Sequence, residues 1–165
     1  MVAGHGLLAF RDPYGIRPLI FGKREGPFGK DYVFASESVA LDTLGFKILR
    51  DVMPGEAIFI DNEKNIHSKQ IEHPSWAPCI FEYVYLARPD SVIDKISVYK
   101  SRLRMGKFLA AQIKKDMKKG LKIDVVVPVP DTARSSAFEI AAQLGLPCRE
   151  GLIKNRYIGR TFIMP

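Results

Sequence analysis

The chain has 165 residues, of which 47% are hydrophobic and 26% are charged. This balance is typical of a soluble globular protein and excludes a disordered chain. No run of about 18 apolar residues occurs, so we expect no membrane span, and MVAGHGLLAF lacks the features of a signal peptide. Two cysteines far apart in the sequence, Cys79 and Cys148, indicate a cytoplasmic chain with free thiols, although the sequence leaves a disulfide open.

Charge is distributed unevenly along the chain, whose formal net charge is +7. Residues 1–90 hold ten Lys/Arg and twelve Asp/Glu, a balance of −2, whereas residues 91–165 hold fifteen and six, a balance of +9. This asymmetry predicts that the second half meets an anion: a phosphorylated small molecule, a nucleic acid or an acidic partner. A solvated basic helix face is the alternative, and it explains part of the excess.

The first half of the sequence consists of short apolar runs that predict strands. One helix interrupts them at residues 36–45, where Ser36 can cap and Gly45 can end the helix. Strands with a single helix and no βαβ alternation predict an antiparallel α+β unit. The predicted strands are residues 6–10, 18–23, 32–36, 46–52, 56–61 and 65–72, and the buried side of the helix is Val39, Leu41 and Leu44.

The second half predicts alternating helices and strands, after a proline-punctuated and aromatic junction near residues 74–94. Residues 97–119 form a helical pattern, with apolar side chains every four residues. KIDVVVPVP at 122–130 is typical of a buried parallel strand. A helix at 133–145 and a strand at 148–154 follow, so the order is that of an α/β doubly wound sheet.

The stretch VVVPVPDTARSSA is the most informative for chemistry, because a predicted strand runs into a turn that opens a helix. Ligands of open α/β sheets bind at the carboxyl ends of strands. Asp131 and Thr132 would stand there beside the positive end of the helix, and they suit a hydrated Mg²⁺ with a phosphate substrate. The alternative, which pattern alone favours, is that either residue simply caps the helix. No phosphate-binding loop of the Walker type is present.

Other polar residues give weaker signals. The three histidines, His5, His67 and His73, have no metal-ligand spacing, and we expect His67 on the surface. Around Arg11-Asp12 and Arg17, which flank a turn, we expect a structural ion pair. In KNRYIGRTFIMP, a glycine with several cations suits a mobile loop that closes on a polyphosphate, and a solvated basic connection is the alternative.

Several stretches together resemble one family. RDPYGIRPL, FASESVALDTLGF, RDVMPGEAIFI, CIFEYVYLARPDS and KNRYIGRTFIMP, in this order, are similar to the glutamine phosphoribosylpyrophosphate amidotransferases, also called amidophosphoribosyltransferases. The resemblance runs from His5 to Pro165. RDP-x-GIRPL with a following ASES is shared more loosely by other class II amidotransferases, whereas EYVYLARPDS and KNRYIGRTF are more specific to this family.

The resemblance implies a fold and an activity. Residues 1–75 would be the C-terminal part of an N-terminal-nucleophile glutaminase domain, residues 76–96 a junction, and residues 97–165 the N-terminal part of a type I phosphoribosyltransferase domain. The family transfers glutamine-derived ammonia to phosphoribosyl pyrophosphate, giving phosphoribosylamine, glutamate and pyrophosphate, in the first step of purine synthesis. Its members are cytoplasmic, and we expect a homo-oligomer.

The resemblance also assigns residues. Thr132 would help to hold Mg²⁺, and Lys154, Arg156 and Arg160 would lie in the loop over substrate or nucleotide phosphates. Cys79 aligns with the first of four iron–sulfur ligands in some members, but the residues do not support a cluster. The family's N-terminal cysteine nucleophile and its acidic metal-binding pair have no counterpart in these residues, so we expect no catalytic residue here and no activity of the chain alone.

Two other functions remain open from the sequence. Purine nucleotides inhibit the family, so the alternative is a nucleotide-binding or regulatory module without catalysis. A nucleic-acid binder is suggested only by the +9 balance, and the aromatic residues stand in apolar runs rather than among the cations, so we expect no nucleic-acid partner.

Overall fold

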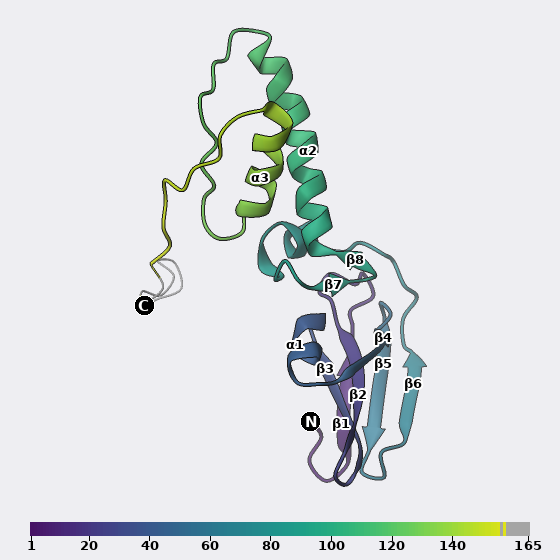
Figure 1. Cartoon of the computed structure of the whole chain (residues 1–165). Coiled ribbons are helices and arrows are strands. Elements are labelled where there is room, and N and C mark those ends of the chain that lie inside the picture. Colours follow the sequence, from purple (N-terminus) through teal and green to yellow (C-terminus); the bar gives the residue numbers. More distant parts are fainter. Residues whose placement is uncertain (156, 158–165) are drawn as a thin grey trace. The chain divides into compact units, whose positions relative to one another are not determined.

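The computed structural model describes residues 1–155 and residue 157. In it the chain divides into two units, Met1–Val98 and the residues from Tyr99 onward. The first unit contains the strands and one short helix, and the second contains most of the long helix α2 and all of α3 (Figure 1). Among the described residues, no helix is both long and apolar enough to cross a membrane.

Six strands of the first unit form two three-stranded sheets, and every pairing in them is antiparallel. The antiparallel unit predicted from the sequence is therefore confirmed. One sheet has the order β1-β5-β6, and the other has the order β3-β2-β4. The strands are β1 (Gly6–Phe10), β2 (Ile20–Gly26), β3 (Gly29–Ala35), β4 (Lys47–Asp51), β5 (Glu56–Asp61) and β6 (Ile66–Gln70).

The core of the first unit lies where these two sheets bury apolar side chains together. Phe21 of β2 is 3% exposed, and its ring stacks on that of Phe34 of β3 at a centroid distance of 4.6 Å. Ile58 and Ile60 alternate along β5 and point to the same side, because side chains of a strand repeat every two residues. Val52 completes this cluster.

Helix α1 (Ser38–Thr43) packs on β2 through Leu41, which is fully buried. A Cβ at Gly22 would lie 2.4 Å from Leu41 Cδ2, so only glycine allows this approach. The predicted stop is confirmed, since Gly45 has φ of 71°. Two details were wrong. Glu37 rather than Ser36 is the N-cap residue, without a side-chain cap, and Leu44 is 54% exposed rather than buried.

Arg11 is the most constrained charged residue of the first unit. It is 4% exposed, and its guanidinium donates five hydrogen bonds, the full capacity of the group. Two go to Asp94, at 2.8 and 2.9 Å. The other three go to backbone carbonyls of Gly15, Arg17 and Val52. The structural ion pair expected around this turn is confirmed for Arg11, although its partner is Asp94; Asp12 accepts the N–H groups of Tyr14 and Ile16 in the turn.

Residues 76–96, expected as a junction, pack on the first unit. They contain a π-helix (Glu82–Leu86) and the short pair β7 (Val92–Ile93) and β8 (Ile96–Ser97). Glu37 Oε2 accepts hydrogen bonds from Arg88 N at 2.8 Å and Ser91 Oγ at 2.7 Å. Arg17 Nε lies 2.6 Å from Glu82 Oε1, a charge contact without hydrogen-bond alignment. Polar contacts therefore attach this segment at several points.

The second unit is built on α2 (Val98–Met117) and α3 (Arg134–Leu144), which confirm the two predicted helices. The helices approach closely at Gly106, where a Cβ would lie 2.6 Å from Ser136 O. Ser136 Oγ donates to Arg102 O at 2.9 Å across the same contact. Gly145, with φ of 69°, ends α3 as predicted.

The strands predicted at 122–130 and 148–154 were wrong in their described residues. A single parallel bridge joins Val126 to Cys148, with Arg149 N donating to Val126 O at 3.0 Å. Pro128 and Pro130 cannot donate, so the ladder cannot continue beyond the bridge. The expected burial is absent as well, since Val129 is 61% exposed.

His67 and the two thiols follow expectation. His67 lies on β6, its side chain is 60% exposed, and its Nε2 lies 2.9 Å from Asp61 Oδ2. Cys79 and Cys148 are both free and half-buried. The prediction of free thiols is therefore confirmed.

Replacement of Arg11 by lysine should destabilise the first unit by about 3 kcal/mol, the lower end of the range for disrupting a buried ion pair. Lysine keeps the charge but places its donors on one nitrogen, which cannot reach all five acceptors. Arg24→Lys is the matched control, because the Arg24–Asp31 pair is 44% and 35% exposed and should contribute about 1 kcal/mol or less. Urea unfolding measures both, and equal losses would contradict this account.

Gly106→Ala should destabilise the second unit, although alanine in an open helix position stabilises by about 1 kcal/mol relative to glycine. The added methyl group meets a backbone carbonyl of α3, and such overpacking costs about 1–3 kcal/mol. Ala111→Gly, at an exposed position of α2, removes the same group and should cost only the helix propensity. A thermal melt that shows Gly106→Ala to be stabilising would exclude the close helix contact.

Candidate functional site

Four charged side chains gather where α3 begins, and we name them the α3 charge cluster: Asp131, Arg134, Glu150 and Lys154. Asp131 lies between two cations, with Oδ2 3.4 Å from Lys154 Nζ and Oδ1 3.9 Å from Arg134 Nε. Arg134 Nη1 in turn lies 3.3 Å from Glu150 Oε1. Two cations and two anions thus alternate along a chain of three ion pairs. The pairs are exposed, so each contributes little to stability.

Two backbone features bring the cluster together. The bridge joins Val126 to Cys148, and a little further along a Cβ at Gly151 would lie 2.9 Å from Val127 Cγ1. This close approach carries Lys154 to the start of α3. Sequence reasoning selected Asp131 and Lys154 but missed Arg134 and Glu150. The spacing of three residues between Asp131 and Arg134 was a usable signal for an ion pair, whereas Glu150 carried none.

The simple capping role weighed for Asp131 and Thr132 is wrong. The N-cap residue is Ala133, and no side chain caps α3. The Asp131 carboxylate turns to the two cations instead, while its backbone carbonyl accepts Arg134 N at 3.4 Å. Thr132 is half-buried at the same turn. The carboxylate and hydroxyl therefore stay available to a ligand that can displace Lys154.

The described residues do not by themselves form a metal site. No group of three or more His, Cys, Asp or Glu side chains gathers anywhere in residues 1–155 or at 157. Asp131 is already neutralised by its cations, so Thr132 would supply one oxygen where Mg²⁺ takes six. An iron–sulfur cluster takes four thiolates, whereas the chain has two cysteines, so Cys79 alone does not fit one.

Two predicted phosphate ligands, Arg156 and Arg160, lie outside the described residues, as does most of the loop predicted to be mobile from Arg156 onward. Residue Tyr157 is described, and it is 99% exposed. Its backbone N–H donates to the Asn155 side chain at 2.9 Å. Of the three predicted phosphate-binding residues, Lys154 alone can be placed in the cluster.

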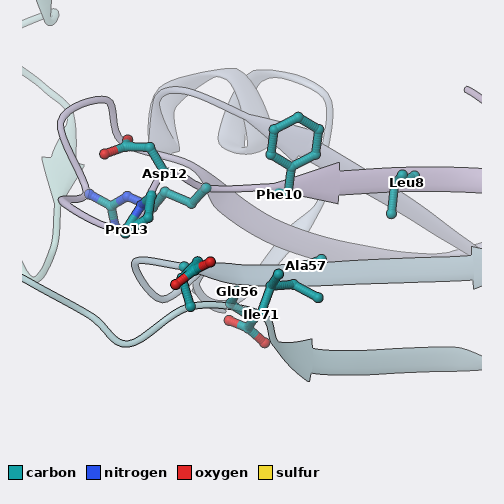
Figure 2. A pocket seen from close by; sticks show the side chains of 10 residues that line it. Leu8, Phe10, Asp12, Pro13, Glu56, Ala57 and Ile71 are labelled. Carbon is teal, nitrogen blue, oxygen red and sulfur yellow. The ribbon is translucent and has the colours of Figure 1, made fainter.

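A pocket of about 440 Å³ opens on the first unit between β1 and the start of β5 (Figure 2). Phe10 stands over it and is 71% exposed. Its described lining contains no Ser, Thr, Cys, His or Lys, and two of its three carboxylates, Asp12 and Glu56, are already held by hydrogen bonds within the fold. The lining residues are Leu8, Phe10, Arg11, Asp12, Pro13, Gly55, Glu56, Ala57, Ile71 and Glu72.

Glu56, at the edge of this pocket, is 5% exposed and fully partnered. Arg50 holds both carboxylate oxygens, at 2.6 and 2.7 Å, and Met53 N donates at 2.8 Å. The Ser68 hydroxyl donates to it as well. Burial opposes the charge, but the hydrogen bonds from Arg50 and Ser68 outweigh it and lower the pKa of Glu56 to about 2. Glu56 therefore has a structural role.

Acid should selectively weaken the contribution of Glu56. Its pKa is lower in the folded chain than the ordinary 4.5, so its stabilisation is present above about pH 4.5 and is lost as the pH falls toward about 2. The lowered pKa corresponds to about 3 kcal/mol at neutral pH. Glu56→Gln should therefore lower the free energy of unfolding at pH 7. Below pH 4.5 this free energy should depend less steeply on pH in the variant than in the wild type, as urea unfolding at several pH values measures.

Asp51 and Glu82 are the internal contrast to Glu56, because burial raises the pKa of both carboxyls. The raised pKa values of these two carboxyls change the free energy of unfolding in the opposite direction with pH. This change is the same in the wild type and in Glu56→Gln. The difference between the two unfolding curves therefore isolates Glu56. A difference that stays constant from pH 7 to pH 2 would show that the Arg50 contact does not depend on ionisation.

Comparison with known proteins identifies relatives along the entire chain. The amidophosphoribosyltransferase of Pseudomonas aeruginosa is 57% identical over 166 residues, which cover 100% of this chain and 33% of that protein. The amidophosphoribosyltransferase of Escherichia coli is 57% identical over 167 residues, again with 100% and 33% coverage. The chain thus spans about a third of the length of the curated relatives that it matches. No protein-family model matches the sequence.

Solved structures agree with the sequence comparison. The glutamine phosphoribosylpyrophosphate amidotransferase of B. subtilis, in complex with ADP and GMP, superimposes with a TM-score of 0.76 at 42% identity. The match covers 96% of this chain and 32% of that one. The mixed α/β content is therefore shared. By both sequence and fold, the whole chain corresponds to a segment, about one third, of an amidophosphoribosyltransferase.

Proposed function

We propose that the chain acts as part of an amidophosphoribosyltransferase. That enzyme transfers glutamine-derived ammonia to phosphoribosyl pyrophosphate, giving phosphoribosylamine, glutamate and pyrophosphate. The observation that carries the proposal is the identity of 57% along the whole chain. In this assignment residues 1–75 belong to the glutaminase domain, residues 76–96 to the junction, and residues 97–165 to the phosphoribosyltransferase domain.

The α3 charge cluster is the phosphate-binding part of this assignment. Lys154 is held 3.4 Å from Asp131, and both side chains are more than half exposed. An incoming phosphate would compete with the Asp131 carboxylate for the same ammonium group, and a group with more negative charge competes better. Thr132, at the same turn, would donate its hydroxyl to a phosphate or offer one oxygen to a phosphate-bound Mg²⁺. Arg134 would add a second cation at the head of α3.

Catalysis by the chain alone is not part of the proposal. The family's glutaminase uses an N-terminal cysteine, and this sequence has no cysteine before Cys79. Without that nucleophile, the covalent route of glutamine hydrolysis is lost. We therefore assign no catalytic residue to this chain.

A second candidate function is nucleotide binding without catalysis. The observation that favours it is the B. subtilis relative, whose structure holds ADP and GMP. A purine nucleotide and phosphoribosyl pyrophosphate both present a phosphorylated ribose, so the α3 charge cluster suits either. The two candidates differ in which ligand binds more tightly, and AMP or GMP titration against phosphoribosyl pyrophosphate distinguishes them.

Ligand titration of the 165-residue chain tests the assignment. Phosphoribosyl pyrophosphate should shift the NMR signals of Thr132 and Lys154, and Lys154→Gln should weaken binding by about tenfold, the effect of roughly 1.4 kcal/mol. Lys122→Gln, an exposed lysine of the same unit, is the matched control and should change nothing. No glutamine hydrolysis or phosphoribosylamine should be detected.

Two outcomes would contradict the proposal. One is binding that Lys154→Gln leaves unchanged or that inorganic phosphate matches. The other is measurable glutamine hydrolysis by the chain alone, which would require a nucleophile different from the one assigned here.

A further inference from the structure

Five cations lie along one side of α2, and we name them the basic stripe: Arg104, Lys107, Lys114, Lys115 and Lys118. Successive members are three, seven, one and three residues apart, and at 3.6 residues per turn all five fall within an arc of about 100°, so they share one face. Lys118 follows the last residue of α2 but still bonds to Lys114 O at 3.2 Å. All five are exposed. The stripe is about 21 Å long at the helical rise per residue.

Nothing in the described part of the chain neutralises this stripe. None of the five makes an ion pair there, whereas the neighbouring Lys119 pairs with Asp116 at 3.6 Å. Asp116 is also the one acidic residue in the sequence of α2. Like charges three and four residues apart repel and lower helix stability. An anion bound along the stripe would remove this repulsion.

The stripe has a gap in its middle, bordered by apolar side chains. Ala111 lies on the same face, four residues after Lys107 and three before Lys114, and it is exposed. Beside it lies Phe108, which is 76% exposed. The side of α2 that contacts α3 is a different one, marked by Gly106 and the buried Ala110. The exposed surface therefore consists of two cationic groups with a small residue and an aromatic ring between them.

We propose that the basic stripe is a docking surface for an acidic amphipathic α-helix of a partner protein. Its carboxylates would form two groups about two turns apart, and an apolar side chain between them would pack on Ala111 and Phe108. The small Ala111 side chain allows the partner backbone to approach closely. Lysine and arginine at helical spacing match aspartate and glutamate at the same spacing on the facing helix.

Other polyanions fit this surface less well. The phosphates of a nucleic-acid duplex are evenly spaced and present no apolar group to Phe108, whereas the cations here are interrupted. A helix that lies on an anionic membrane needs a broad apolar face, and of the large exposed apolar side chains of α2, Phe108 alone borders the stripe. The observations therefore favour an acidic helix.

A synthetic helical peptide tests the proposal. Its glutamates form two clusters two turns apart with leucines between them, and a control peptide carries glutamine in place of glutamate. Fluorescence anisotropy with the 165-residue chain should detect the acidic peptide and not the control. Lys107→Glu with Lys114→Glu should weaken binding by about tenfold or more, and Phe108→Ala by about fivefold, since each removes a separate part of the surface.

The matched control is Lys47→Glu with Lys69→Glu, which makes the same change of net charge at exposed positions of β4 and β6. This variant should bind the peptide as wild type does, and circular dichroism should show that both double variants fold. Equal weakening by the two variants would reduce the effect to net charge and overturn the proposal.

Two further ligands distinguish the sources of negative charge. A short DNA duplex and vesicles of phosphatidylserine and phosphatidylcholine should bind more weakly than the acidic peptide. Neither should be sensitive to Phe108→Ala. Tighter binding of either one, with loss in the Lys107→Glu/Lys114→Glu variant, would assign the stripe to that polyanion and overturn the acidic helix.

Discussion

The buried guanidinium of Arg11 is the interaction on which the first unit depends. A charged group that is 4% exposed is tolerated only when every donor is satisfied. Here the acceptors come from three separate parts of the chain: the turn after β1, the end of β4, and Asp94 in the segment before α2. None of these can shift without leaving part of the guanidinium unpaired. The geometry of the turn, the sheets and the following segment is thereby fixed at one point.

Around this point the carboxylates divide into two kinds. Asp94 pairs directly with Arg11, whereas burial and the negative charge of Asp94 raise the pKa of the nearby Asp51. The Asp94 backbone N–H also donates to Asp51 at 3.3 Å. Trp76, whose ring lies 5.4 Å from the Arg11 guanidinium carbon, adds a contact from the start of the junction. The junction is therefore part of the packed unit, which explains why its sequence contains so many aromatic residues.

Local sequence patterns predicted the helices and strands whose formation depends on residues close together in the chain. The strands of the first unit and the helices α1, α2 and α3 follow from period, turn residues and terminal glycines. The Arg11–Asp94 pair could not be predicted, because its partners are 83 positions apart and no pattern links them. Asp12 makes its contacts locally instead, since its carboxylate accepts the N–H groups of Tyr14 and Ile16 in its own turn.

The strands expected at 122–130 and 148–154 failed for a related reason. The valines have the composition of a buried parallel strand, but burial requires a covering layer, and Val125 and Val127 are each 41% exposed. Parallel strands also need neighbours on both sides to form a regular ladder. This chain covers 33% of the length of its Pseudomonas aeruginosa relative. The remaining two thirds of the proposed parent enzyme would provide such neighbours. The valine pattern is therefore typical of a strand that forms only when further strands and a covering layer flank it.

Charged side chains of the second unit form two surfaces, the α3 charge cluster and the basic stripe. The +9 balance of residues 91–165 predicted that the second half meets an anion, without saying where. The structure places two cations and two anions in the α3 charge cluster, so that site contributes no net charge. The five cations of the basic stripe, by contrast, have no ion-pair partner within residues 1–155. A phosphate entering the α3 charge cluster must displace the Asp131 carboxylate, whereas an anion on α2 displaces only water and counterions. The asymmetry of the sequence thus reflects the basic stripe more than the phosphate site, and the two surfaces can be tested separately.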